Sequence, residues 1–405
     1  MTGISRRHMV AGSGALAMTA ASARALAETV GVTKTEIKIG NTSAYSGPAS
    51  AYSTGAKSFI AFFDMINEQG GVNGRKIKII TLDDGYVPSK TVEVVRRLVE
   101  QDQVAFIAAP LGTAPNSAIQ KYLNQKKVPQ LFLASGADKF ADPQNFPWTI
   151  GWAPSYRTEG QIYAKYIMRE RPNAKIGVIY QNDDLGKDYV LGLKDVFGKD
   201  YDKKVIKQVS YEVTDPTVDS QVLTLKDSGA DALVSACTPK FAAQLIRRAY
   251  DIAWQPLHCM SNVSASVGTV MKPAGPEKGI GIITSAYIKD ASDPAWKDDP
   301  GVIEFKAFSA KYNPTADMGD SSNVVGYGYA ITTLQVLQQC GEDLSRENIM
   351  RQAANIRDLD PKILFPGIMI NTSPTNFRPI RKMQLTRWNG TIWEIFGELL
   401  EGAPV

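Results

Sequence analysis

The chain has 405 residues, which is long enough for two domains that each have a full-sized core. Hydrophobic residues make up 44% of it and aromatic residues 9%, a composition that excludes a largely disordered chain. The formal net charge is +4, and no basic block interleaved with aromatic residues occurs, so we expect no nucleic-acid partner.

Residues 1–27 have the pattern of a twin-arginine-like signal peptide. Arg6 and Arg7 precede a small, apolar stretch over residues 10–23, and "ALA" at 25–27 fits a cleavage site. The stretch is too short and too rich in glycine and serine to be a good membrane span. The alternative is a disordered cytosolic tail. We interpret the segment as a signal for export to the periplasm, by the twin-arginine route or the Sec route.

Removal of this signal would change the charge balance. It would take away Arg6, Arg7 and Arg24 but no acidic residue, so the 45 basic side chains become 42 (45 minus 3) against 41 acidic ones. The mature protein is therefore expected to be nearly neutral.

From residue 36 the chain alternates between predicted strands and helices. Apolar or alternating runs predict strands at "EIKIG", "KIKIITLDD", "VAFIAA" and "VPQLFLAS", with amphipathic helical stretches after the first three. After "WTIGWAPSY" the rhythm restarts, with strands predicted at "AKIGVIYQND", "KVIKQVSYEV", "DALVSAC" and "QPLHCMSN" and helices over 158–170, 186–198, 217–228 and 239–253. This alternation predicts two α/β halves, each with a parallel sheet covered by helices on both faces.

A third section begins at Gly279. It contains a predicted strand, "GIGIITSAY", then a polar loop over 289–301 and helices over 301–312, 323–339 and 345–355. The last two predicted strands, "RKMQLTRW" and "TIWEIFGE", flank Asn389 and Gly390, a pair that is typical of hairpin turns.

The three cysteines allow two interpretations. Cys237 and Cys259 end successive apolar runs and could form one disulfide, which would leave Cys340 as a thiol. We favour the other interpretation, three buried thiols, since single cysteines often pack as small hydrophobic residues.

Residues suited to catalysis are scarce. Once the signal is removed, His258 is the only histidine, and it stands in a strand-like run where a packed core residue is expected. The chain has no G-x-S-x-G elbow, no phosphate-binding P-loop and no C-x-x-C pair. We therefore expect no catalytic residue, no metal site and no cofactor.

Two pairs of adjacent aspartates, Asp83-Asp84 and Asp183-Asp184, end predicted strands and invite a metal or acid–base interpretation. Adjacent side chains on a strand point to opposite faces, so neither pair forms a compact site by itself. Turn and helix-capping roles are favoured. A carboxylate-dependent hydrolase stays open as an alternative.

Small and hydroxyl residues follow the predicted strands in both halves. They form the loops "SAYSGPAS" (43–50), "PLGTAPN" (110–116), "ASGADKF" (134–140), "QNDDLG" (181–186), "ACTPKF" (236–241) and "MSNVSAS" (260–266). Ligands of open α/β sheets bind outside the carboxyl ends of the strands. Six such loops in two halves predict a ligand-binding cleft between two sheets.

The stretch from residue 37 to 99 carries S-G-P, I-N-x-x-G-G-V-N-G and D-D in a characteristic order, and "FPGIMINTSP" follows near the end. With these motifs the mature chain resembles the periplasmic solute-binding proteins of ABC importers, more narrowly the branched-chain amino acid (leucine/isoleucine/valine) binding type. The resemblance implies a type I periplasmic binding protein: two Rossmann-like lobes with parallel sheets, joined by three crossovers near 151–156, 283–287 and 366–374. Lobe 1 would comprise residues 28–151 and 287–366, and lobe 2 residues 152–286 and 367–405.

The resemblance also implies the ligand contacts. Thr113, with Leu111 and Gly112 beside it, corresponds to the loop that holds the ligand carboxylate. Ser135, Gly136 and Asp138 correspond to the loop near the ligand's polar head, and Tyr52 to an aromatic residue that covers the side-chain pocket. The two cysteines that form a disulfide in the best-known relatives correspond to Tyr86 and Gly112, so that bridge is absent.

Several positions depart from the family pattern. The place of a glutamate that meets the ligand's ammonium group falls at Asn262 or Val263, and aromatic positions of the second lobe appear as Leu185 and Thr238. A buried ammonium without a charge partner is costly. Either Asp138 restores that partner, or the ligand is a carboxylate without an amine, such as an aromatic or short aliphatic acid, or a neutral amide. Arg157 could also reach a carboxylate, although a solvated or capping role is favoured.

The expected function is that of a periplasmic substrate-binding component, which closes around a small carboxylate or amino-acid-like ligand and delivers it to the membrane permease of an ABC importer. The first alternative is a sensing receptor component of the same fold. The second is the exported hydrolase that would use the aspartate pairs.

Overall fold

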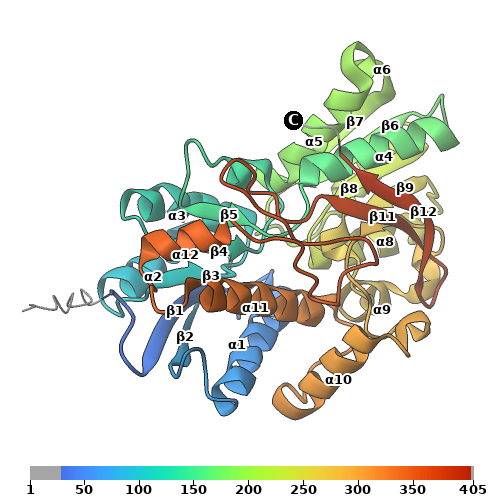
Figure 1. The fold of residues 1–405 in the computed structure, drawn as a ribbon. Helices are drawn as coiled ribbons and strands as arrows, with labels where there is room; N and C mark the ends of the chain where they lie inside the picture. Colours follow the sequence, from blue (N-terminus) through green and yellow to red (C-terminus); the bar gives the residue numbers. More distant parts are fainter. Residues whose placement is uncertain (1–28, 403–405) are drawn as a thin grey trace, which may run out of the picture.

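The computed structural model describes residues 29–402, so the predicted signal over 1–27 lies outside the described residues. Two separate sheets organise these residues into two lobes (Figure 1). The first sheet has five parallel strands in the order β2 (Lys76–Asp83), β1 (Glu36–Ser43), β3 (Phe106–Ala108), β4 (Gln130–Leu133) and β5 (Thr149–Gly151).

The second sheet has seven strands. Five are parallel, in the order β7 (Val205–Tyr211), β6 (Ile176–Gln181), β8 (Ala232–Ala236), β9 (Leu257–Met260) and β10 (Ile283–Ala286). The sheet continues with two antiparallel strands, β11 (Lys382–Trp388) and β12 (Trp393–Glu401). The hairpin loop covers residues 389–392, and the Oδ1 atom of Asn389 accepts hydrogen bonds from the N–H groups of Thr391 and Ile392, both at 2.9 Å.

Helices cover the sheets of both lobes. The first lobe holds α1 (Ser53–Glu68), α2 (Pro88–Glu100), α3 (Thr113–Gln125), α10 (Pro300–Tyr312), α11 (Ser321–Cys340) and α12 (Arg346–Ala353). The second lobe holds α4 (Tyr156–Glu170), α5 (Asp184–Phe197), α6 (Tyr201–Lys204), α7 (Asp219–Asp227), α8 (Pro239–Asp251) and α9 (Lys272–Ala274). The predicted fold class, two α/β lobes with parallel sheets, is confirmed.

The chain passes between the lobes three times: from β5 to α4, from β10 toward α10, and from α12 to β11. The last two passages pair with each other. The N–H of Lys289 donates to the carbonyl of Ile363, and the N–H of Phe365 donates to that of Tyr287, both at 2.9 Å. The lobes are therefore joined by a short hydrogen-bonded ribbon as well as by the first passage. The exact lobe limits stay a prediction.

The cysteines and the histidine are buried. Cys237, Cys259 and Cys340 are free thiols, which confirms the favoured interpretation. His258 hydrogen-bonds through Nε2 to the Ser235 hydroxyl at 2.7 Å, and burial lowers the pKa of its imidazole to about 3. The ring is thus a neutral core residue, as predicted. Within residues 29–402, the helices are all too short or too polar to cross a bilayer.

Helices α1 and α11 approach each other through two glycines. A Cβ on Gly326 of α11 would lie 2.0 Å from the carbonyl oxygen of Gly55 in α1, closer than any real contact. Gly326 therefore sets how near the two helices lie, and with them the position of the α11 amino terminus at the cleft.

Substitution Gly326→Ala should lower the free energy of unfolding by roughly 1–3 kcal/mol, because the added methyl group forces the two helices apart. Urea unfolding of residues 28–405 measures this change. Gln338→Ala on the exposed side of the same helix is the control and should shift stability by less than about 0.5 kcal/mol. Equal effects of the two variants would contradict the close-packing argument.

Candidate ligand-binding site

A cavity that is partly open to solvent lies between the lobes. Its walls come from both sheets and from the crossovers. Nine of the eleven predicted site residues line it: Tyr52, Leu111, Gly112, Thr113, Ser135, Leu185, Thr238, Asn262 and Val263. The carboxyl ends of strands from the two sheets thus face one cleft, as the loop pattern predicted. The roles of these residues toward a ligand stay a prediction.

Hydroxyl groups gather at the start of α3. The hydroxyls of Thr113 and Ser135 are 2.7 Å apart and both residues are almost fully buried. The N–H of Thr113 donates to the Tyr86 hydroxyl at 3.3 Å, whereas that of Ala114 has no acceptor among residues 29–402. An unpaired N–H in a helix's first turn favours a bound anion. We call this group of residues the α3 end of the cavity.

Tyr86 and Gly112, the positions of the absent disulfide, are in contact. Gly112 has φ +97°, and a Cβ there would lie 2.4 Å from the ring of Tyr86. The tyrosine ring fills this space and carries a hydroxyl to the cavity wall. The resemblance to the family implied no role for Tyr86 beyond replacing a cysteine.

Tyr156, at the start of α4, was also missed. It lines the cavity and interacts with the hydroxyls of Ser135 and Thr113, and burial raises the pKa of its phenol to about 12. It therefore stays protonated and can donate a hydrogen bond at the α3 end. The only feature of the sequence that could have indicated its place in the cavity wall was its position directly after the first crossover.

Gly136 and Asp138 do not line the main cavity; they lie at a smaller hollow beside it. The carboxylate of Asp138 accepts a hydrogen bond from the Ser155 hydroxyl at 2.5 Å and pairs with Arg378 at 3.3 Å. A Cβ on Gly136 would lie 2.2 Å from the carbonyl oxygen of Pro154. The structure therefore places both residues against the first crossover and not in the wall of the main cavity, and their contact with a ligand stays a prediction.

The acidic pairs act as turns and caps. Asp83 accepts hydrogen bonds from the N–H groups of Tyr45 and Gly85 at 3.0 and 2.9 Å. Asp183 caps α5 through the N–H of Leu185 at 3.0 Å. Arg157 is paired with Asp195 by two bonds of 2.7 Å. Among residues 29–402, no group of three or more His, Cys, Asp or Glu side chains is placed to hold a metal ion.

The buried carboxylate of Glu159, in α4, contacts Asn262. It accepts hydrogen bonds from the N–H and the side-chain amide of Asn262, from Ser285 at 2.7 Å, and from the hydroxyls of Tyr163 and Tyr189. Burial raises the pKa of Glu159 despite these donors. Glutamate is common in the first turn of helices, so nothing in the sequence indicated that Glu159 would hold Asn262.

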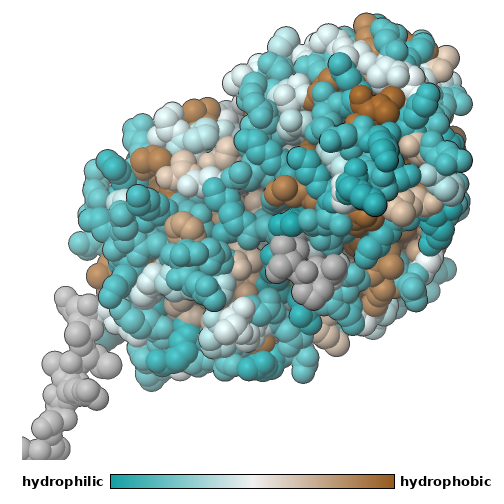
Figure 2. Space-filling model, turned by 90° about the horizontal axis from the view of Figure 1, so that it is seen from above, coloured by the Kyte–Doolittle hydropathy of each residue, from teal (hydrophilic) through white to brown (hydrophobic). Residues whose placement is uncertain are grey.

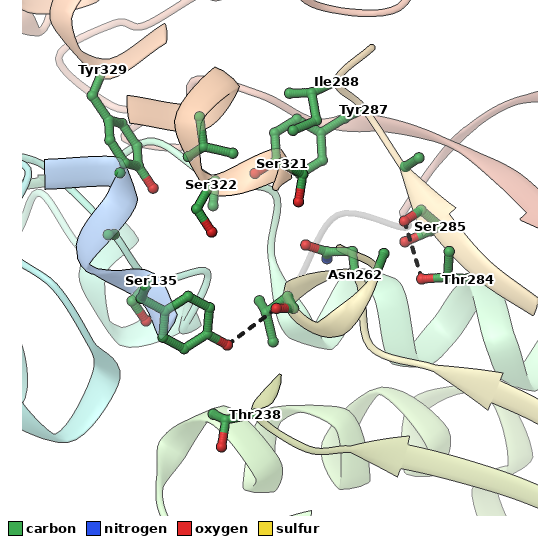
Figure 3. A pocket seen from close by; sticks show the side chains of 18 of the residues that line it. Ser135, Thr238, Asn262, Thr284, Ser285, Tyr287, Ile288, Ser321, Ser322 and Tyr329 are labelled. Carbon is green, nitrogen blue, oxygen red and sulfur yellow. Dashed lines mark hydrogen bonds between the residues drawn. The ribbon is translucent and has the colours of Figure 1, made fainter. Parts of the chain in front are cut away.

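Contacts across the cleft hold the lobes together around the cavity. The Tyr52 hydroxyl donates to the Val263 carbonyl at 3.1 Å, the dashed line beside Ser135 in Figure 3. Elsewhere the N–H of Asp138 donates to Asp188 at 2.7 Å, and Lys139 pairs with Asp184 at 3.0 Å. The structure therefore shows a closed arrangement.

The cavity wall is almost uncharged. Of the described residues, no Lys, Arg or His lines it, and its only acids are Asp290 and Asp293 on the second crossover. Hydroxyls and aromatic rings make up much of the remainder. A ligand would be held by hydrogen bonds and apolar contacts rather than by an arginine clamp.

The family model described as "Periplasmic binding protein" matches residues 36–391. The chain belongs to this family. Its members bind solutes and are not enzymes, so the hydrolase alternative is set aside. Among curated relatives, the protein is 25% identical over 304 residues to Leu/Ile/Val-binding protein homolog 7 of Brucella abortus, an alignment that covers 72% of this chain and 75% of the relative.

Solved structures share the fold at low sequence identity. A branched-chain amino acid ABC transporter protein from Thermus thermophilus with bound valine matches with a TM-score of 0.82 and 15% identity, over 92% of this chain and 98% of that one. A solute-binding protein from R. palustris in complex with benzoate matches with a TM-score of 0.76 and 18% identity, over 91% and 97%. These likenesses confirm the type I periplasmic binding protein fold.

Substitution Asp188→Asn should flatten the pH dependence of this binding protein's stability. Burial raises the pKa of Asp188 to about 7, so between about pH 4 and 7 the folded protein binds more protons than the unfolded chain. The free energy of unfolding then falls as the pH rises through this window, by at most about 1.4 kcal/mol per pH unit. Urea unfolding at several pH values measures the slope.

Asp195→Asn on the same helix is the matched control, because its partner Arg157 holds the pKa of Asp195 below its usual value. That variant should lose stability mainly above about pH 4, the opposite sign. An unchanged slope in Asp188→Asn would mean that Asp188 is ionised in the folded protein throughout this range.

Proposed function

We propose that this protein is the periplasmic substrate-binding component of an ABC uptake system. It closes around a small carboxylate or amino-acid-like ligand and delivers it to a membrane permease. The observation that carries the proposal is the pair of buried hydroxyls, Thr113 and Ser135, beside an unpaired N–H at the α3 end of a closed interlobe cavity. Export to the periplasm, with residues 1–27 as the signal, is part of the proposal.

The ligand contacts proposed are the nine predicted residues that line the cavity, together with Tyr86 and Tyr156. Their geometry supports a carboxylate at the α3 end, since hydrogen bonds to an ionised acceptor are stronger than neutral ones. The amine of an amino acid has less support: no acid stands at 262 or 263, and Asp138 is engaged elsewhere. A carboxylate without an amine is therefore the ligand class proposed, and Asp290 and Asp293 on the second crossover are the carboxylates in the wall that an amine could meet.

The mechanism proposed is a shift between open and closed populations. A ligand that touches Thr113 in one lobe and Asn262 in the other stabilises the closed form by the difference in its affinity for the two forms. The contact between Tyr52 and Val263 spans the same cleft. A sensing role would use the same closure to signal to a receptor, and association with a permease or with a receptor in membranes separates the two.

A thermal-shift screen of residues 28–405 tests the ligand class, with aliphatic amino acids, amides, aromatic acids and short carboxylates as probes. A probe at a hundredfold its Kd should add about 2.7 kcal/mol to stability. Stabilisation by acids without an amine is the expected result. Stabilisation by leucine or valine alone would contradict the preference for a ligand without an amine. No shift with any probe, after removal of carried-over ligand, would contradict the proposed function.

Substitution Thr113→Val should weaken the binding of the best acid by roughly tenfold to a hundredfold, as expected for loss of a hydrogen bond to a charged group. Isothermal titration calorimetry measures the Kd. Thr224→Val, on an exposed position of α7, is the matched control and should leave the Kd unchanged. Equal affinities in all three proteins would place the carboxylate elsewhere.

A further inference from the structure

Two tyrosine hydroxyls face the cavity from the side of the crossovers. Tyr287 lies on the second crossover and Tyr329 on α11, and both line the cavity while being only 5% and 7% exposed. In Figure 3 the Tyr287 hydroxyl points toward Asn262, whereas the Tyr329 hydroxyl enters the cavity on the side of Ser322. Neither hydroxyl has a hydrogen-bond partner among residues 29–402.

The two rings are fixed by a common neighbour. Trp152 packs edge-on against Tyr287 with ring centroids 6.0 Å apart and against Tyr329 at 4.8 Å. The indole is completely buried, and its N–H donates to the Thr332 hydroxyl at 2.9 Å. The phenol hydroxyls are therefore held in place before a ligand arrives, which lowers the entropic cost of binding.

Asn262 completes this region with an acceptor. Its side-chain N–H group is held by the carboxylate of Glu159, which fixes the orientation of the amide. The oxygen Oδ1 then has no partner among the described residues and faces the cavity (Figure 3). A ligand in the cavity would cover these polar groups, which are costly when covered and left unpaired, so a ligand that pairs with them gains both affinity and specificity.

We propose that the Tyr287 hydroxyl and the amide oxygen of Asn262 form a second polar subsite, with the Tyr329 hydroxyl farther along the same cavity, and that it binds an uncharged hydroxyl or amide group of the ligand at a distance from its carboxylate. We call it the phenol subsite. A hydroxyl can accept from a phenol and donate to the Asn262 oxygen at the same time. The inference rests on the proposed function and specifies its ligand class: a carboxylate that carries a neutral hydrogen-bonding group.

The surroundings favour a neutral group over a cation. Glu159, the carboxylate nearest to Asn262, already accepts from five donor groups. Asp290 and Asp293 line the cavity, but each gives one oxygen to its own loop, through Ser292 at 2.8 Å and Ala295 at 2.8 Å. An ammonium group at the phenol subsite would therefore gain little from Glu159, and the second oxygens of Asp290 and Asp293 are the carboxylate atoms that the test below has to separate from it.

Matched acids test the subsite. The probes are hexanoate, its ω-hydroxy derivative and its ω-amino derivative, and the same three terminal groups on a phenylpropanoate framework. Titration calorimetry should show that, on at least one framework, wild type binds the hydroxy acid about tenfold more tightly than the plain acid. The double variant Tyr287→Phe/Tyr329→Phe should lose this preference and keep its Kd for the plain acid within about twofold, because only the hydroxyls are removed.

Tyr250→Phe, at an exposed position, is the control and should keep the preference. Equal weakening of all acids in the double variant would mean that the phenols act only in packing and would overturn the inference. A preference of wild type for the amino acids, lost in Asp290→Asn/Asp293→Asn, would overturn it in favour of a cationic ligand. Binding of plain acids without any preference would leave the proposed function standing and refute the subsite, whereas no binding of any probe by folded wild type would contradict both.

Discussion

The packing of Trp152 is the constraint on which the relation between the two lobes depends. Its indole follows β5 directly, so it lies on the first crossover, and it contacts Tyr287 on the second crossover and Tyr329 on α11. A Cβ on Gly328 of α11 would lie 2.8 Å from the same indole, so the helix packs against the ring too closely for a larger residue. The ring therefore ties the first crossover to the second crossover and to α11. Its two tyrosine neighbours also form part of the cavity wall.

The cavity combines little charge with many hydroxyls. Each polar group is held by protein rather than by solvent: Thr113 by Ser135, Asn262 by Glu159, and the two phenols by Trp152. Such a wall discriminates by hydrogen-bond geometry, which is a sharper filter than an apolar pocket provides. The outer surface differs from it: Figure 2 shows a mostly hydrophilic face on which hydrophobic residues occur in small, separate groups.

The fold followed from the sequence because each parallel strand is a short apolar run with an amphipathic helix after it, and these patterns are local. Strand β5 has only three residues, which is too short for an apolar run or an alternation to predict it. Its pairing with β4 defines it. The cavity wall was predictable where it lies at strand ends, as with Thr113, Ser135 and Asn262. Asp138 lies beside the main cavity because the 3₁₀ turn over Asp138–Ala141 directs its carboxylate toward the start of α4. The sequence could not predict that Tyr287 and Tyr329 line the cavity, since only the packing of distant segments around Trp152 brings them there.

The three unpaired thiols have a consequence for how the protein matures. Cys237, Cys259 and Cys340 lie inside the core, and burial raises the pKa of each thiol above its usual value, so they remain protonated and poorly reactive. No covalent link has to form before the lobes can pack. Folding of the described residues does not need an oxidant, and the chain can reach its native state as readily under reducing conditions as under oxidising ones.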